Sequence, residues 1–86
     1  MSDSEELLKF PCEFPIKVMG TASQDFEAMV VETVHRHIGA FNTVKSRYSN
    51  GGKYMSVTVT FIAKSRPQLD ALYMELTKHE LVKMVL

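Results

Sequence analysis

The histidines are the first candidates for chemistry in this sequence. His35 and His37 lie two positions apart in a segment with helical spacing. Two residues advance an α-helix by about 200°, so these imidazoles point to opposite sides and do not share one metal ion. Their position just before Gly39 is typical of a helix end, where positive charge is favoured. His79, alone near the end of a second helical segment, has the same interpretation.

The single cysteine, Cys12, is the candidate nucleophile. A reactive thiolate needs a neighbouring base, and one cysteine allows no internal disulfide. Its neighbours in the sequence are Lys9 and Glu13, and the carboxylate of Glu13 opposes a thiolate. We therefore interpret Cys12 as a small apolar side chain near the start of the first strand. With no nucleophile and base in a known arrangement, we expect no enzyme activity, no cofactor and no metal site.

The glycine-containing segment 49–53 shares only its composition with a phosphate-binding loop. It reads Ser-Asn-Gly-Gly-Lys and lacks the Gly-x-x-x-x-Gly-Lys-Ser/Thr spacing. It also joins two segments with strand patterns rather than a strand and a helix. Asn-Gly pairs are typical of tight hairpins, because such turns need positive backbone φ angles. The segment therefore predicts a hairpin turn.

Alternating apolar and polar residues predict the strands that position these groups. We expect strands at 14–20, 43–49, 53–63 and 81–86. The third is the clearest, because every second residue from Met55 to Ala63 is apolar while the residues between are mostly polar. A sheet with one apolar and one polar face is covered on one side only. In the last strand we expect Val82 and Met84 to face inward and Lys83 outward.

Two amphipathic segments, 23–38 and 65–79, predict helices. The first has a possible N-cap at Ser23 and an apolar residue at every fourth position from Phe26 to Ile38. In the second, Ser65 with Gln68 three residues later resembles a capping box.

The order strand, helix, strand, strand, helix, strand predicts the α+β class. Right-handed crossovers then give a ferredoxin-like βαββαβ sandwich, with a four-stranded antiparallel sheet of order 4-1-3-2 and two helices on one face. We expect residues 1–13 to form a flexible N-terminal tail, whose Phe10 packs on the core, and residues 14–86 to form one domain. With 45% hydrophobic and 23% charged residues, the composition excludes wholesale disorder.

The uncovered face of this sheet is the main candidate site. The alternation places these side chains there together: Lys17, Met19, Lys45, Arg47, Ser56, Thr58, Thr60 and Lys83. Three interpretations stay open, namely a solvated face, a face covered by a partner and a face that binds RNA. RNA readers of this fold stack bases on aromatic residues of the middle strands, whereas Tyr54 stands only at a strand's beginning. Ten basic and ten acidic residues give zero net charge, which also argues against binding nucleic acid.

Several short segments spread over nearly the full length carry a resemblance to a known family. They are Phe10-Pro11, Lys17-Val18-Met19-Gly20, His35-Arg36-His37, Gly52-Lys53-Tyr54 with Ser56-Val57, Leu72-Tyr73 with Leu76, and Val82-Lys83-Met84-Val85-Leu86. In these segments the chain resembles the small bacterial YbeD-like proteins. It implies a ferredoxin-like fold similar to ACT-type regulatory domains, which bind amino acids in metabolic enzymes. That family has no established activity and no defined functional residues, so none is carried over. Its members often lie near lipoate-synthesis genes, which hints at a metabolic-enzyme partner.

Three classes of function follow as hypotheses. The leading one is a non-enzymatic regulatory or interaction module, with the sensing of a small anionic metabolite as one form of it. By analogy with ACT-type domains, it would be a homodimer paired through a sheet edge such as the short last strand, or through helices, with a shared ligand site. Gly20 and Thr21 at the first strand-to-helix turn would contact a carboxylate. The alternatives are nucleic-acid binding through the basic face and a small hydrolase or transferase. The acidic N-terminus lacks a signal peptide's pattern and no apolar run is long enough to span a membrane, so we expect a cytoplasmic protein.

Overall fold

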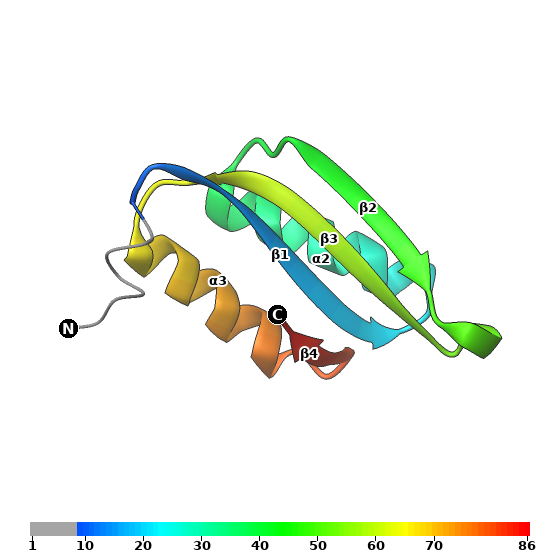
Figure 1. The fold of residues 1–86 in the computed structure, drawn as a ribbon. Coiled ribbons are helices and arrows are strands. Elements are labelled where there is room, and N and C mark those ends of the chain that lie inside the picture. Colours follow the sequence, from blue (N-terminus) through cyan, green and yellow to red (C-terminus); the bar gives the residue numbers. More distant parts are fainter. Residues whose placement is uncertain (1–8) are drawn as a thin grey trace.

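The structure is a computed structural model, which describes residues 9–86. Figure 1 shows the elements in chain order. They are β1 (Cys12–Thr21), α2 (Gln24–Ile38), β2 (Thr43–Tyr48), β3 (Tyr54–Ala63), α3 (Arg66–Lys78) and β4 (Val82–Val85), with a short 3-10 turn, η1 (Asn50–Gly52), between β2 and β3. Residues 1–8 of the predicted tail lie outside the described residues.

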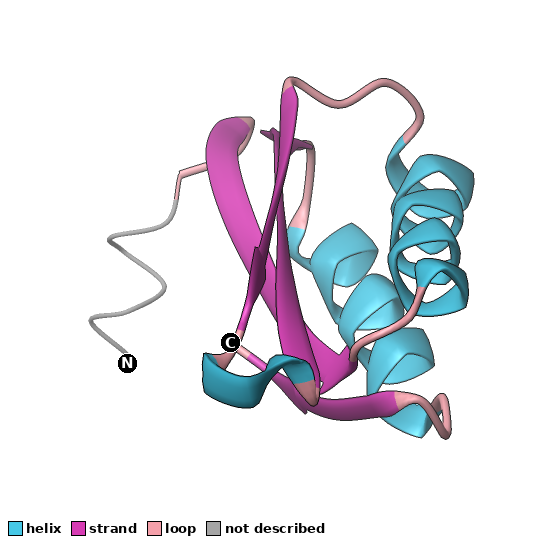
Figure 2. Cartoon of the chain, turned by 90° about the vertical axis from the view of Figure 1, so that its right-hand side faces the viewer, coloured by secondary structure: helices cyan, strands magenta, loops and turns pink. Residues whose placement is uncertain are grey.

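The four strands form one antiparallel sheet with the order β2-β3-β1-β4. This is the predicted order 4-1-3-2, counted from the opposite edge. Both α-helices lie on the same side of the sheet, as Figure 2 shows in edge view, and within residues 9–86 no α-helix covers the other face. The predicted ferredoxin-like βαββαβ fold is therefore confirmed.

The core lies between the sheet and the helices. The inward side chains of β3, from Met55 to Ala63, are buried at every second residue, as their alternation predicted. They meet Phe26, Val30 and Val34 of α2 and Leu69, Leu72 and Leu76 of α3. Each such apolar side chain removed from water stabilises the fold by about 1.5–3 kcal/mol. Among residues 9–86, this core therefore occupies one side of the sheet only.

The first strand begins earlier than predicted. Cys12 and Glu13, which we assigned to the tail, already pair with Ala63 and Ile62 of β3. Phe10 is half-buried and packs against the core, as predicted. Pro15 lies within this strand, opposite Thr60. The pairing of β1 with β3 continues on both sides of it, at Phe14 and at Ile16.

The predicted helix caps are present. The Oγ of Ser23 accepts a hydrogen bond from the Phe26 amide at 3.0 Å, and that of Ser65 accepts from the Gln68 amide at 3.3 Å. The Oε1 of Gln68 accepts from the amide of Lys64 at 2.8 Å, so the reciprocal bond goes one residue beyond that of a standard capping box. These bonds satisfy amides that the first turns of both helices leave unpaired.

The predicted hairpin turn is also present. Gly51 and Gly52 have φ angles of 85° and 74°, in the region that favours glycine. The Ser49 and Tyr54 backbones close the turn with a 2.8 Å bond from the amide of Ser49 to the carbonyl of Tyr54.

The last strand differs from its prediction. In the pairing of β1 with β4, Met19 lies opposite Met84 and Gly20 lies opposite Val82, so Lys83 is the extra residue of a β-bulge. The bulge shifts the alternation by one residue. Met84 therefore shares the side of Met19 and is 51% exposed, so the prediction that it faces inward was wrong.

Candidate functional site

The helix-free face of the sheet, here called the open face, brings the predicted residues together in rows. One row runs across three strands as Lys45, Thr58 and Lys17. The next row runs as Arg47, Ser56, Met19 and Met84. Thr60 lies in the row beyond the lysines, between Thr43 and Pro15. Of the predicted open-face residues, the rows contain Lys17, Met19, Lys45, Arg47, Ser56, Thr58 and Thr60, and they also contain Met84, which was not predicted there. The function of these residues stays a prediction.

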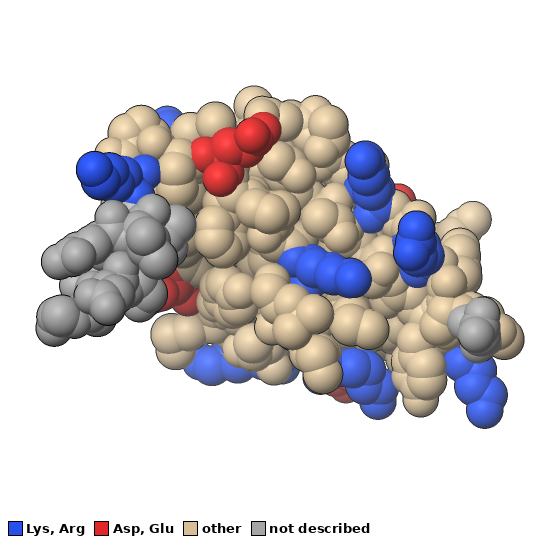
Figure 3. Space-filling model, viewed as in Figure 1, with Lys and Arg blue, Asp and Glu red and all other residues tan. Residues whose placement is uncertain are grey.

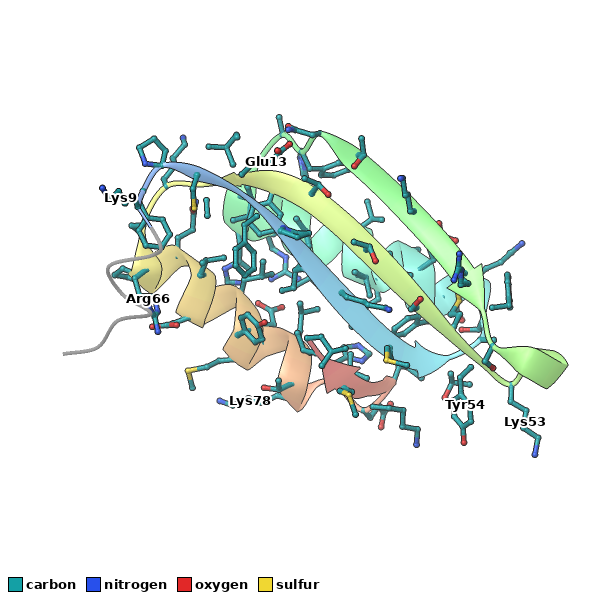
Figure 4. The ribbon with its side chains drawn as sticks, viewed as in Figure 1. Lys9, Glu13, Lys53, Tyr54, Arg66 and Lys78 are labelled. Carbon is teal, nitrogen blue, oxygen red and sulfur yellow. The ribbon has the colours of Figure 1, made fainter. Side chains whose placement is uncertain are left out.

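A hollow of about 420 Å³ lies over the first of these rows and is called the cationic hollow. Its lining residues are Lys17, Lys45, Ser46, Arg47, Ser56 and Thr58. Within residues 9–86, none of its three cations forms an ion pair with a carboxylate. Figure 3 shows basic side chains spread over this part of the sheet. The main acidic group of that view lies towards the other end, where Figure 4 labels Glu13.

A second hollow, of about 390 Å³, lies beside the hairpin end of the sheet and is called the methionine hollow. It is lined by Met19, Gly20, Ser49, Tyr54, Lys83 and Met84. Tyr54 is 47% exposed, and Figure 4 shows it with Lys53 at the end of β3 that adjoins the turn. Large apolar side chains are therefore accessible beside the predicted Lys83.

The two hollows form one continuous surface. A smaller hollow of about 180 Å³ lies between them and is lined by residues of both. It shares Lys17 and Arg47 with the cationic hollow, and Met19 and Tyr54 with the methionine hollow. Positive charge and exposed apolar surface thus lie side by side on one face.

The predicted ligand contact at Gly20 and Thr21 has a different environment. Gly20 is buried, and a Cβ added there would overlap the carbonyl oxygen of Leu81 and the ring of Phe26. The amide of Thr21 donates to the carbonyl of Leu81 at 3.4 Å, and the amide of Ala22 donates to that of Lys53 at 3.0 Å. Close packing therefore accounts for a glycine at position 20, and the amides of Thr21 and Ala22 already donate hydrogen bonds within the protein. The binding of a carboxylate there stays a prediction.

The histidines have structural contacts. The Nε2 of His37 lies 2.7 Å from Oε1 of Glu75, and Nη1 of Arg36 lies 2.8 Å from Oε2 of the same carboxylate. The hydrogen bond from His37, followed by that from Arg36, lowers the pKa of Glu75 below its usual value. This cluster ties the end of α2 to α3. His35 Nδ1 lies 3.0 Å from the carbonyl oxygen of Gly39, at the helix end.

Other sites for chemistry do not emerge from the described part of the chain. Among residues 9–86, no three His, Cys, Asp or Glu side chains are grouped so that they could hold a metal ion. Cys12 is half-buried opposite Ala63 in β1. No helix in this part of the chain is long and apolar enough to cross a membrane.

Met84 is the residue of the open face that sequence reasoning missed. Alternation from Val82 assigned it to the core, and the bulge at Lys83 reverses that assignment. The one signal in the sequence is Gly20, because a glycine at a strand position often marks a bulge or the close approach of another backbone. Here the backbone that approaches it is that of Leu81, directly before β4.

The fold has a relative among solved structures. The solution structure of protein HP0495 from H. pylori superposes with a TM-score of 0.75, covering 92% of this chain and 85% of that one. The two sequences are 16% identical, so the likeness concerns the fold alone.

Closer relatives are found by sequence. The chain is 46% identical over 85 residues to a UPF0250 protein of Paraburkholderia phymatum, covering 96% of each chain. It is also 46% identical over 89 residues to a UPF0250 protein of Chromobacterium violaceum, covering both chains completely. A UPF0250 protein of Neisseria gonorrhoeae is 44% identical over 82 residues, covering 93% of this chain and 90% of the relative. A family model described as a protein of unknown function (DUF493) matches residues 5–86. The chain therefore belongs to this family of small bacterial proteins of unknown function.

Proposed function

We propose that this protein is a non-enzymatic interaction module that binds a partner protein through its open face. One observation carries the proposal, namely that cations and methionines form a single hollowed surface on the sheet face opposite α2 and α3. Within residues 9–86 the cations of the cationic hollow have no ion-pair partner, Met84 is exposed and Met19 is half-buried. A merely solvated face has no need of Met19 and Met84 next to Tyr54. Methionine, tyrosine and arginine are the residue types that protein interfaces favour.

The absence of an enzymatic role is supported by how the reactive side chains are engaged. In the described residues, His37 is bound to Glu75 between the helices, and Cys12 lies in the ladder opposite Ala63. The ionisable groups that line the open hollows are lysines, an arginine and tyrosines. These groups offer binding rather than a nucleophile with its base.

Nucleic-acid binding through the same face is the second candidate, favoured by the three cations of the cationic hollow. Two observations weigh against it. The central positions of β1 and β3 carry Lys17, Met19, Ser56 and Thr58 instead of aromatic rings. The chain also has zero net charge, which weakens its long-range attraction for a polyanion.

Metabolite sensing in the manner of ACT-type domains is the remaining version of the regulatory proposal. It would place a small anion at Thr21 and a second copy of the chain along the exposed edge of β4. A metabolic enzyme, with a link to lipoate synthesis by family analogy, would then be the regulated partner. The paired amides of Thr21 and Ala22 favour the open face over this turn.

Photo-crosslinking from two positions tests the proposed function. We would place p-benzoylphenylalanine at Thr58, in the middle of the open face, and at Ala71, which is exposed on α3 on the helix side. Expressed in its native cytoplasm, the protein should crosslink from position 58 to a defined partner, and position 71 should give no such product. The proposal would be refuted if position 58 gave no crosslinked product, or if both positions gave the same products.

A further inference from the structure

The cations of the open face are arranged to receive more than one carboxylate. Neighbouring strands are about 4.8 Å apart, so Lys17 and Lys45, two strands apart, have backbones separated by about 10 Å. Arg47 lies two residues beyond Lys45 on the same strand, about 7 Å along it. The hydroxyls of Ser56 and Thr58 lie between them and add uncharged donors. Carboxylates placed here would accept charge-assisted hydrogen bonds from groups that form no ion pair within the described residues 9–86.

The methionine hollow has the opposite chemistry. Met19 and Met84 lie directly opposite each other across the pair of β1 and β4, with Tyr54 at the rim. Unbranched thioether side chains adapt to the shape of an apolar guest, and a tyrosine ring offers contact area at small entropic cost. This hollow therefore suits a leucine or an aromatic side chain better than a charged group.

The distance between the two hollows limits what occupies them together. The row of Met19 lies two residues along β1 from Lys17, about 7 Å away, and Tyr54 lies a further two residues along the sheet. An extended chain covers this distance in two to four residues. Acidic groups and an apolar side chain must therefore stand within a few residues of each other in the guest.

We propose that the open face recognises an acidic segment of a partner protein in which a leucine or aromatic side chain stands two to four residues from the carboxylates. This inference rests on the proposed function and names the chemistry of its partner. The carboxylates bind in the cationic hollow and the apolar side chain binds in the methionine hollow. Charge complementarity favours a partner segment of negative charge, and the apolar side chain distinguishes one acidic sequence from another.

Two other occupants have related chemistry. Residues 1–8 of this chain read Met-Ser-Asp-Ser-Glu-Glu-Leu-Leu and contain both acids and leucines. Single-stranded RNA offers phosphates but no aliphatic anchor, and it prefers stacking platforms that the centre of the sheet lacks. Both occupants are separate arms of the test.

The experiment is an NMR titration of the full-length, ¹⁵N-labelled protein with synthetic peptides. The main probe is a ten-residue peptide of Asp, Glu, Ser and Gly in which a Leu-Phe pair follows the acids by two residues. In the first matched peptide serines replace the Leu-Phe pair, and in the second lysines replace the acids. The amides of Lys17, Met19, Arg47, Tyr54 and Met84 should shift with the main probe. The serine peptide should bind at least 5-fold more weakly, and the lysine peptide should leave the face unchanged.

Charge reversal gives the stricter comparison. The double variant Lys45→Glu, Arg47→Glu changes two exposed side chains of the edge strand and should bind the main probe at least 10-fold more weakly. The same variant should gain affinity for the lysine peptide. The control variant, Lys64→Glu with Lys78→Glu, makes the same change in net charge at exposed positions that line none of the three hollows, and it should bind as the parent does. The variant Met19→Ser, Met84→Ser should bind the main probe and the serine peptide equally.

Four results would overturn the inference. They are equal binding of the main and serine peptides, equal loss in both charge-reversed variants, tighter binding of an oligouridylate than of the main probe, and open-face shifts on deletion of residues 1–8 that the peptide 1–8 restores. None of them decides the proposed function, because crosslinking from Thr58 detects a partner of any chemistry.

Discussion

Replacing Gly20 with alanine tests whether this residue serves packing or ligand binding. A Cβ at this position would overlap the carbonyl oxygen of Leu81 and Cε1 of Phe26, and it would lie 2.8 Å from Cζ of that ring. The carbonyl belongs to the backbone that leads into β4 and also accepts the amide of Thr21. Neither neighbour moves freely, because Phe26 is fully buried among core side chains.

The expected loss of stability follows from these contacts. Overpacking a filled core costs about 1–3 kcal/mol. Weakening the bond from Thr21 to Leu81 adds about 1 kcal/mol. The smaller entropy of the unfolded alanine chain returns about 0.4–1 kcal/mol. We therefore expect Gly20→Ala to lower the free energy of unfolding by about 1–3.6 kcal/mol, with a middle value of about 2 kcal/mol. In a domain of this size that corresponds to a fall in Tm on the order of 10 °C.

Urea denaturation followed by circular dichroism measures this change. Thr21→Ala is the matched control, because its side chain is exposed and its amide bond is retained, so its stability should stay within about 0.5 kcal/mol of the parent. A Gly20→Ala variant as stable as the parent would refute the packing explanation. It would also reopen the interpretation of Gly20 as a residue kept for a ligand.

Three further predictions concern the faces of the sheet, the helix contact and the first helix cap. Val57→Ala should cost about 1–3 kcal/mol in urea denaturation because its side chain is fully buried, whereas Thr58→Ala, one residue later on the open face, should cost less than about 0.5 kcal/mol; equal losses would contradict the one-sided core. Because His37 and Arg36 lower the pKa of Glu75 in the folded chain, their stabilisation is fully present above pH 4.5 and is lost as the pH falls through the lower, folded pKa. The melting temperature of Glu75→Gln should accordingly fall less steeply than that of the parent as the pH is lowered. Identical slopes of melting temperature against pH would disprove the linkage. Ser23→Ala removes the 3.0 Å bond to the Phe26 amide and should lower the free energy of unfolding by about 1 kcal/mol, whereas an unchanged urea midpoint would show that this cap contributes nothing.

Local patterns were sufficient to predict most of this fold. The unbroken apolar alternation of β3 defined the inner face of the sheet, and the serine caps defined where both helices begin. With the order of the six helices and strands predicted, right-handed crossovers and a one-sided core allowed few topologies. The observed strand order is the predicted one. The open-face positions of Lys17, Lys45 and Arg47 followed directly from that alternation.

The remaining differences arise from contacts between distant segments. The bulge at Lys83 depends on how β4 meets Gly20 and Thr21, some sixty positions earlier in the chain, so the strand's own sequence cannot reveal it. The bond that joins His37 to Glu75 depends in the same way on the packing of α2 against α3. The methionine hollow was missed for the first of these reasons, because it needs Met84 on the outer side.

The most direct test of binding through the open face is the crosslinking yield from position 58, measured in the full-length parent and in the two charge-reversed variants. We predict a strong product in the parent, an unchanged product with Lys64→Glu and Lys78→Glu, and at least a 10-fold weaker product with Lys45→Glu and Arg47→Glu. A product that survives reversal of the open-face charges, or that forms equally well from position 71 on α3, would contradict the account.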